Sequence, residues 1–119
     1  MARPTPPRSQ KPIDIISNGA GRVLMAGFVN HCLRRIDLAT RHVTVWAGLP
    51  EQEGYQDGAA LQARFSYPMA LARDAAGSIF IGDYGNHCIR RVQRSPLTGE
   101  LQVDTLTGHH VLTSTTRTR

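Results

Sequence analysis

The sequence predicts an all-β protein made of two similar units, each a sheet of four short antiparallel strands. The first observation is an internal repeat: residues 21–36 align without a gap with residues 77–92, at an offset of 56 residues. The second is a series of short apolar segments separated by turn-forming residues, which is typical of strands joined by hairpins. A repeat of this kind indicates stacked copies of one small structural unit.

The first hairpin of each unit has the clearest signals. A proline precedes a short apolar strand, and Asn18 or Asp74 then begins a turn that includes a glycine three residues later. Asn, Asp and Gly favour such turns because they bond the turn backbone or accept positive φ angles. The second strands, at 23–25 and 79–81, are continuous apolar triplets rather than alternating ones. We therefore expect both faces of each sheet to be covered.

The third and fourth strands follow the repeated Asn-His pair. We expect third strands at 32–37 and 88–93, and fourth strands at 43–47 and 101–106. The turn between them is four residues longer in the second unit than in the first. Four short strands joined by hairpins, followed by four more, is the pattern of β-propeller blades, which cover both sheet faces by stacking.

The segment between the units predicts one short helical turn. Asp57 suits an N-cap, and the run after Gly58, A-A-L-Q-A-R-F, has high helix propensity. Leu61 and Phe65 lie four residues apart, so one helical turn would place both against the edge of a blade. The expected divisions are thus 12–67 for the first blade with this linker and 68–108 for the second.

The formal charge of +5 is concentrated in the two ends of the chain. Residues 1–11, a Pro-rich basic segment, and residues 109–119 are expected to be disordered tails. Residues 12–108 carry nine basic and nine acidic side chains, so the folded part is formally neutral and nucleic acid is a disfavoured partner. Without a signal peptide or a membrane-spanning apolar run, the expected location is cytoplasmic by default, with no membrane partner.

The second unit resembles the NHL repeat family. Residues 68–92 follow the family pattern of Pro, apolar strand, Asp, Gly, apolar strand, Asp-x-Gly-Asn-His and Ile-Arg-Arg. The linker, G-Y-Q-D-G-A-A-L-Q-A-R-F-S-Y-P, also resembles an insert found in one group of these proteins, so the resemblance covers about residues 12–108. The first unit departs from the pattern: Gly27 replaces the motif aspartate Asp83, and Val29 replaces Gly85. We expect its turn to be differently bonded.

This resemblance implies a ring of commonly six blades. Its usual roles are scaffolding and binding of proteins or ligands, with RNA binding in some members and zinc-dependent lyase activity on peptidyl-hydroxyglycine in a few. Two blades cannot close a ring and would leave apolar faces open. Three explanations follow: the chain is a fragment of a longer propeller, it folds marginally, or it completes a ring as a homo-oligomer, namely a symmetric trimer.

The polar side chains of the motif are the candidate interaction residues: Asp83, Asn86, His87, Arg90 and Arg91, with Asn30, His31, Arg34 and Arg35 in the first unit. As ligand contacts they would lie on the ring surface. We favour a structural role, in which Asp83 and Asn86 bond turn amides and Arg90 bridges to a carboxylate. The paired arginines could also form a basic stripe suited to phosphate, although nearby acids favour partial neutralisation.

No catalytic residue, metal or cofactor is predicted. The pairs His31-Cys32 and His87-Cys88 carry zinc-ligand atoms, but adjacent residues of a strand point to opposite faces, so neither pair chelates a metal alone. We therefore expect a non-enzymatic propeller segment that acts as a protein-interaction scaffold for an unidentified protein partner. The alternatives are part of a metal-dependent lyase-like enzyme, and RNA binding through a basic face.

Overall fold

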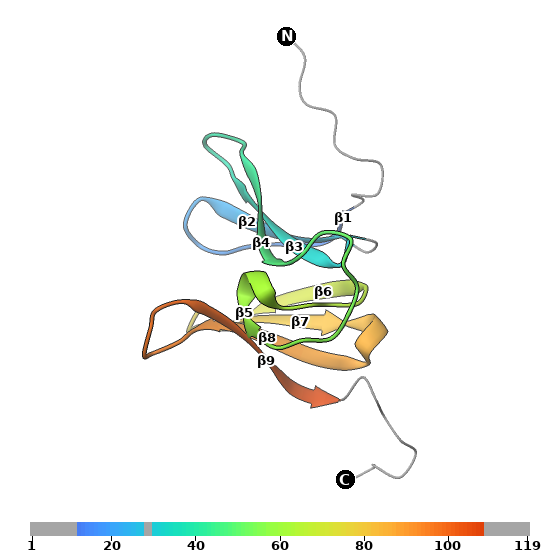
Figure 1. Ribbon diagram of the computed structural model, residues 1–119. Coiled ribbons are helices and arrows are strands. Elements are labelled where there is room, and N and C mark those ends of the chain that lie inside the picture. Colours follow the sequence, from blue (N-terminus) through green and yellow to red (C-terminus); the bar gives the residue numbers. More distant parts are fainter. Residues whose placement is uncertain (1–11, 28–29, 109–119) are drawn as a thin grey trace, which may run out of the picture.

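The computed structural model describes residues 12–27 and 30–108, which form two antiparallel β-sheets (Figure 1). The tails expected at 1–11 and 109–119 lie outside the described residues. The first sheet has the order β1-β2-β3-β4, with bounds Pro12–Ser17, Arg22–Gly27, Cys32–Asp37 and Val43–Gly48. The second has the order β5-β9-β8-β7-β6, with bounds Gly58–Ala59, Leu101–Gly108, Cys88–Arg94, Ile79–Asp83 and Pro68–Arg73. The all-β prediction is confirmed.

The repeat extends to the hydrogen bonding of the first hairpins. The amide of Asn18 donates to the Arg22 carbonyl at 3.0 Å, and the amide of Asp74 donates to the Ser78 carbonyl at 3.1 Å. The Asp74 carboxylate also accepts from two amides of its own turn, as expected of this residue type. The first strand of both sheets carries a register shift directly after its opening proline. The two units therefore share irregularities as well as strands.

The linker differs from the prediction. It forms the two-residue strand β5, paired with β9, and then the 3₁₀ turn η1 (Ala60–Gln62). The expected N-cap by Asp57 is wrong, because β5 pairing at Gly58 delays the turn until Ala60 and no side chain caps it. The pinning role of Leu61 is also wrong, since this side chain is 58% exposed, whereas Phe65 is fully buried. A 3₁₀ turn has three residues per turn, so side chains four apart do not share its face.

The core lies between the two sheets. Strands β1 and β2 lie against β6, and β4 lies against η1. Figure 1 shows the linker passing from the first sheet to the far edge of the second. The core is formed by buried apolar side chains from both sheets and the linker: Leu24, Ala26, Leu33, Ala47, Ala60, Ala63, Phe65, Leu71, Ile79, Ile81, Val92 and Val103.

Two side-chain hydrogen bonds among the described residues tie the first sheet to β6 and to the residue before it. The Asp14 carboxylate accepts from the Leu71 amide at 2.8 Å, and Nδ1 of His31 accepts from the Tyr67 amide at 3.1 Å. The His31 ring also meets the Tyr67 ring edge to face, with 4.5 Å between centroids. His31 reaches this position from a left-handed backbone conformation, with φ of 58°. These bonds set how one sheet sits on the other.

Candidate functional site

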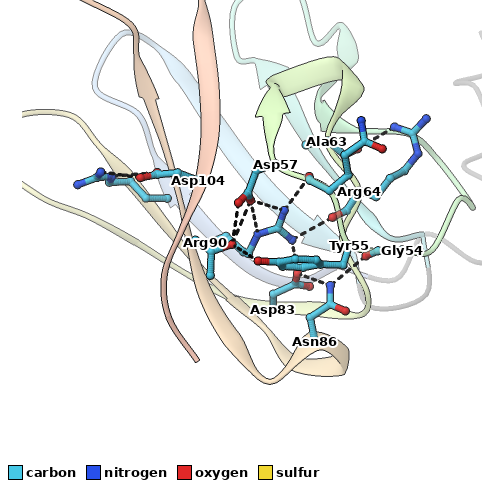
Figure 2. Close-up of polar contacts among 12 residues, drawn as sticks. Gly54, Tyr55, Asp57, Ala63, Arg64, Asp83, Asn86, Arg90 and Asp104 are labelled. Carbon is cyan, nitrogen blue, oxygen red and sulfur yellow. Dashed lines mark hydrogen bonds and ion pairs between the residues drawn. The ribbon is translucent and has the colours of Figure 1, made fainter. Parts of the chain in front are cut away.

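The centre of the repeated motif in the second unit is a buried arginine. The Arg90 side chain is fully buried, and all three of its nitrogens donate hydrogen bonds (Figure 2). Nη1 donates to the Asp83 carboxylate at 2.6 Å and the Arg64 carbonyl at 2.9 Å. Nη2 donates to the Asp57 carboxylate at 2.9 Å and the Gln56 carbonyl at 2.8 Å, and Nε also reaches Asp57. A strand of the second sheet thereby holds three linker residues through four hydrogen bonds.

Asp83 is the buried anion that faces this guanidinium. Its carboxylate also accepts from the Ser66 amide at 2.8 Å and from the Asn86 side chain at 2.8 Å. Asn86 donates in addition to the Gly54 carbonyl at 2.9 Å. Burial raises the pKa of Asp83, and the hydrogen bonds from Asn86, Ser66 and Arg90 oppose that rise. The structural role expected for Asp83, Asn86 and Arg90 fits these contacts.

Two aromatic rings complete the surroundings of Arg90. Its guanidinium carbon lies 4.8 Å from the centroid of the Tyr55 ring and 4.9 Å from that of Phe65. Cations are attracted to such ring faces, more strongly when water is excluded. The Tyr55 hydroxyl lies 2.8 Å from the Thr105 hydroxyl, which itself bonds Asp57. The linker is therefore tied to β9 as well as to β8.

The first unit has a related arrangement at the equivalent position. Gly27 stands in place of Asp83, and the Arg34 guanidinium donates to the side chain of Asn30 at 2.9 Å. Arg34 is half-buried, whereas Arg90 is fully buried. The turn for which we expect different bonding contains residues 28 and 29, which lie outside the described residues, so that expectation stays a prediction. In the second unit, a Cβ at Gly85 would collide with Ser66, so the glycine allows the close approach of turn and linker.

The remaining candidate residues do not form one surface. Arg91 pairs with Asp104 at 2.7 Å on the surface of the second sheet. Arg34 and Arg35 are successive residues of β3 and project to opposite faces. Because Arg90 is buried, the basic stripe considered from the sequence is not formed by the four arginines. His87 is exposed, unlike its counterpart His31.

The cysteines are free and buried, and the part of the chain that the structure describes holds no group of three or more His, Cys, Asp or Glu side chains placed to bind a metal. Burial raises the pKa of the Cys32 thiol, with Arg34 opposing it. Burial, together with the charge of Asp83, raises the pKa of Cys88 to about 11. Both thiols are therefore weak nucleophiles in the folded protein.

This shift predicts slow alkylation of Cys88. At about pH 8, a thiol of pKa about 11 has about 100-fold less thiolate than one at the ordinary value of 9.0. We expect iodoacetamide to modify Cys88 about 100-fold more slowly in the folded protein than in urea at the same pH. Peptide mass spectrometry would follow the rates, with the Cys32→Ser variant isolating this thiol. Equal rates in the two states would contradict the burial of the sulfur.

Sequence reasoning missed the part that two linker residues, Asp57 and Tyr55, take in this site. Their contacts with Arg90 bridge 33 residues or more of sequence. The available signal was the D-G dipeptide within a linker of unusual composition. It was interpreted as a helix start, because an N-cap is the commonest local role of an aspartate before such a run.

No protein-family model matches the chain. It is 29% identical over 83 residues to the protein SUPPRESSOR OF QUENCHING 1, chloroplastic, of Arabidopsis thaliana, a match that covers 70% of this chain and 8% of that protein. Two solved structures from Bacteroides thetaiotaomicron are similar. One is a structural genomics protein of unknown function, with a TM-score of 0.60 and 24% identity over 71% of this chain and 20% of the other. The second is an auxiliary nutrient binding protein, with a TM-score of 0.56 and 22% identity over 74% and 23%.

These structural likenesses concern the fold alone, which is compatible with a β-propeller-like arrangement. The chain spans less than a quarter of each of the three proteins. Within residues 12–27 and 30–108, no helix has the length and apolar character needed to cross a membrane. The chain is therefore an all-β repeat protein of two stacked sheets.

Proposed function

We propose that this chain is a segment of an NHL-type β-propeller and acts as a non-enzymatic protein-interaction scaffold. The observation that carries this proposal is an apolar sheet face that no residue within 12–27 or 30–108 covers, whereas its counterpart in the repeat is buried. The partner that fits this face is another sheet of the same type. In a solution of this chain, a second copy supplies that sheet.

The first half of the argument concerns the outer face of the first sheet. Alternation along the strands places its apolar residues away from the second sheet: Ile13, Ile15, Val23, Met25, Ile36 and Val43. Ile15 is 54% exposed and Val43 is 50% exposed. At the offset of 56, the counterparts of Ile15, Val23 and Met25 are Leu71, Ile79 and Ile81, which the first sheet covers in the core. The outer face of the first sheet thus has the same apolar character as the face of the second sheet that the first sheet covers.

The second half concerns the free face of the second sheet, which carries Phe80, Ile89 and Leu106. Ile89 is 38% exposed and Leu106 is 44% exposed. Phe80 and Ile89 are the counterparts of Leu24 and Leu33, which cover the second sheet from the first. The two sheets are therefore stacked head to tail. Each end of the stack therefore resembles one side of the contact that the two sheets already make inside the molecule.

The buried motif supports a scaffold rather than a catalytic role. The charged groups that suggested chemistry, Asp83 and Arg90, are occupied by bonds that hold the linker. Their donors and acceptors are directed at protein backbone and at each other. The surface is therefore what we expect partners to contact, and both end faces carry exposed apolar side chains, among them Ile15 and Ile89.

Head-to-tail association predicts a specific result for single-face variants. We expect the wild-type chain to associate in a concentration-dependent manner, while Ile15→Glu or Ile89→Glu alone is monomeric, because a charge on either face blocks the only junction. A mixture of the two variants should form a one-to-one dimer through the two unmodified faces. Size-exclusion chromatography with light scattering measures each mass, and Leu97→Glu, 92% exposed on a hairpin, is the control.

Two outcomes would contradict the proposal. A wild-type chain that stays monomeric at high concentration, with the sheet content intact by circular dichroism, would show that neither face binds a second copy. If Ile89→Glu still dimerised, the interface would be between two identical faces. A discrete trimer and an open series of sizes both agree with a heterologous junction, and they differ only in whether the rotation closes a ring.

A further inference from the structure

A cleft lies between the two sheets, on the side of the turns that join β1 to β2 and β6 to β7. It has a volume of about 540 Å³, and the buried side chains Ile79 and Val92 are among its lining residues. A second hollow of about 360 Å³ shares four of its lining residues, so the two adjoin: Arg35, Trp46, Arg94 and Leu101. The combined hollow is open to solvent and enters the inter-sheet core.

Three arginines converge on this cleft from both sheets. Arg22 and Arg35 lie on the face of the first sheet that carries Leu24, because Leu24 is two residues from Arg22 and pairs with Arg35. Arg94 lies on the face of β8 that carries the core residue Val92. All three line the larger hollow. With Glu100, which lines the smaller one, the ionisable lining residues have a formal charge of +2.

Arg35 is the unusual member of this group. Its counterpart in the second unit, Arg91, is neutralised by Asp104, which is its cross-strand neighbour. The cross-strand neighbour of Arg35 is Thr44, and the Arg35 guanidinium has no hydrogen bond or ion pair with any described residue. It is half-buried, so its charge is partly removed from water. The repeat thus shows what neutralises this position in one unit, and that carboxylate is missing in the other.

Arg22 has a donor that is incompletely satisfied. Its Nε lies 3.5 Å from the Asp37 carboxylate, close enough for an ion pair, yet this nitrogen is buried and makes no hydrogen bond among the residues described. Arg94 is exposed and donates to the Gly99 carbonyl at 2.8 Å, so its charge has no carboxylate partner among the described residues. A buried donor without an acceptor costs free energy that a bound oxyanion would recover.

We propose that this cleft binds a small organic anion, in which a carboxylate or phosphate group meets Arg35 between Arg22 and Arg94. Planar guanidinium groups bind such oxyanions through paired, charge-assisted hydrogen bonds. The apolar part of the ligand would lie against Trp46 and Leu101, which line both hollows. Glu100 at the rim disfavours extended polyanions, so a small ligand fits better than a nucleic-acid strand.

This inference does not depend on the interaction proposed above, because both walls of the cleft belong to one chain. The Ile15→Glu variant, designed to block association, should therefore retain anion binding. Failure of the anion site and failure of the head-to-tail junction are then separate results. One is measured on the monomeric variant, and the other on mixtures of variants.

Trp46 makes the test direct, because it is the one tryptophan of the sequence and lines the cleft. We expect cyclohexanecarboxylate to change its fluorescence in a saturable manner, and inorganic phosphate to do so more weakly. Arg35→Gln should weaken cyclohexanecarboxylate binding about tenfold, as loss of a charge-assisted pair does. Arg41→Gln removes the same charge from an exposed turn and should change the affinity less than about twofold.

The neutral analogue cyclohexanecarboxamide separates anion recognition from apolar burial. Binding of the carboxamide as tightly as the carboxylate would overturn the proposal, and so would equal affinity of the wild-type chain and Arg35→Gln. Equal weakening by Arg41→Gln would also overturn it, since that result would indicate a general effect of net charge. Circular dichroism of each variant confirms that the sheets are intact during the measurement.

Discussion

Arg90→Met should lower the free energy of unfolding by about 3–5 kcal/mol, because it leaves the fully buried Asp83 carboxylate without its cation. The same change removes the donors that hold the Asp57 carboxylate and the linker carbonyls of Gln56 and Arg64. Methionine keeps much of the side-chain volume, so the loss reflects charge and hydrogen bonding more than a cavity. Urea unfolding followed by circular dichroism measures it.

Arg91→Met is the matched control. Arg91 is the next residue of the same strand and also pairs with an aspartate, but its side chain and that of Asp104 are 29% and 46% exposed. Surface pairs of this kind contribute at most about 1 kcal/mol. If the two variants lost the same stability, the buried contacts of Arg90 would not hold the linker, and the structural interpretation of the motif would be wrong.

The loss of stability caused by Arg90→Met should depend on pH. Burial already raises the pKa of Asp83 above 3.8, and removal of the opposing guanidinium raises it further. A carboxyl group whose pKa is higher in the folded state than in the unfolded state destabilises the fold when it is ionised. This destabilisation is largest above the folded-state pKa and decreases as the pH falls through that pKa. The stability difference between wild type and Arg90→Met should therefore be largest at neutral pH. It should narrow as the pH is lowered toward the ordinary aspartate value.

Phe65→Ala is the second change with a large expected effect. Phe65 is fully buried, belongs to the core between the sheets and lies against the Arg90 guanidinium. Truncation of a buried phenylalanine costs about 3–5 kcal/mol through lost burial and the cavity left behind. Globular domains have total stabilities of about 5–15 kcal/mol. We therefore expect the variant to be largely unfolded at moderate urea concentrations where the wild type is folded.

Leu61→Ala tests the same linker from its exposed side. Leu61 is 58% exposed, so its truncation should change the free energy of unfolding by less than about 0.5 kcal/mol. The pair of variants thus separates the two residues that the sequence suggested would act together. A loss for Leu61→Ala as large as that for Phe65→Ala would mean that η1 presents Leu61 to the core in solution.

The strands were predictable because their signals are local. Asn or Asp followed by glycine marks each first hairpin, and the offset of 56 residues carries the assignment from the clearer second unit to the first. Strand boundaries agree within a few residues, and the eight expected strands are all present. The division of residues into buried and exposed faces was not predictable, because continuous apolar triplets do not reveal which face another sheet covers.

The linker could not be predicted because its contacts are long-range. Asp57 looks like a helix cap from its neighbours, but Arg90, 33 residues later, offers two donors to its carboxylate.

The end of the repeat could not be recognised at the fixed offset, because the turn before the fourth strand is longer in the second unit. Gly48 and Gly108 both end a fourth strand opposite a cysteine and both have positive φ, of 86° and 83°. They align only when four extra residues are allowed, so the fixed offset separates them.

The attachment of the linker to Arg90 of β8 bears on how such proteins evolve. A duplicated segment that began at Pro68 would carry Arg90 but lack Asp57, and its buried cation would have one carboxylate instead of two. A segment that began a few residues before Gly54 would carry the whole set of partners. The segment that would have to be duplicated as a whole therefore begins in the linker, before the motif by which the repeat is recognised. Recombination within the linker would be selected against more strongly than recombination just before it.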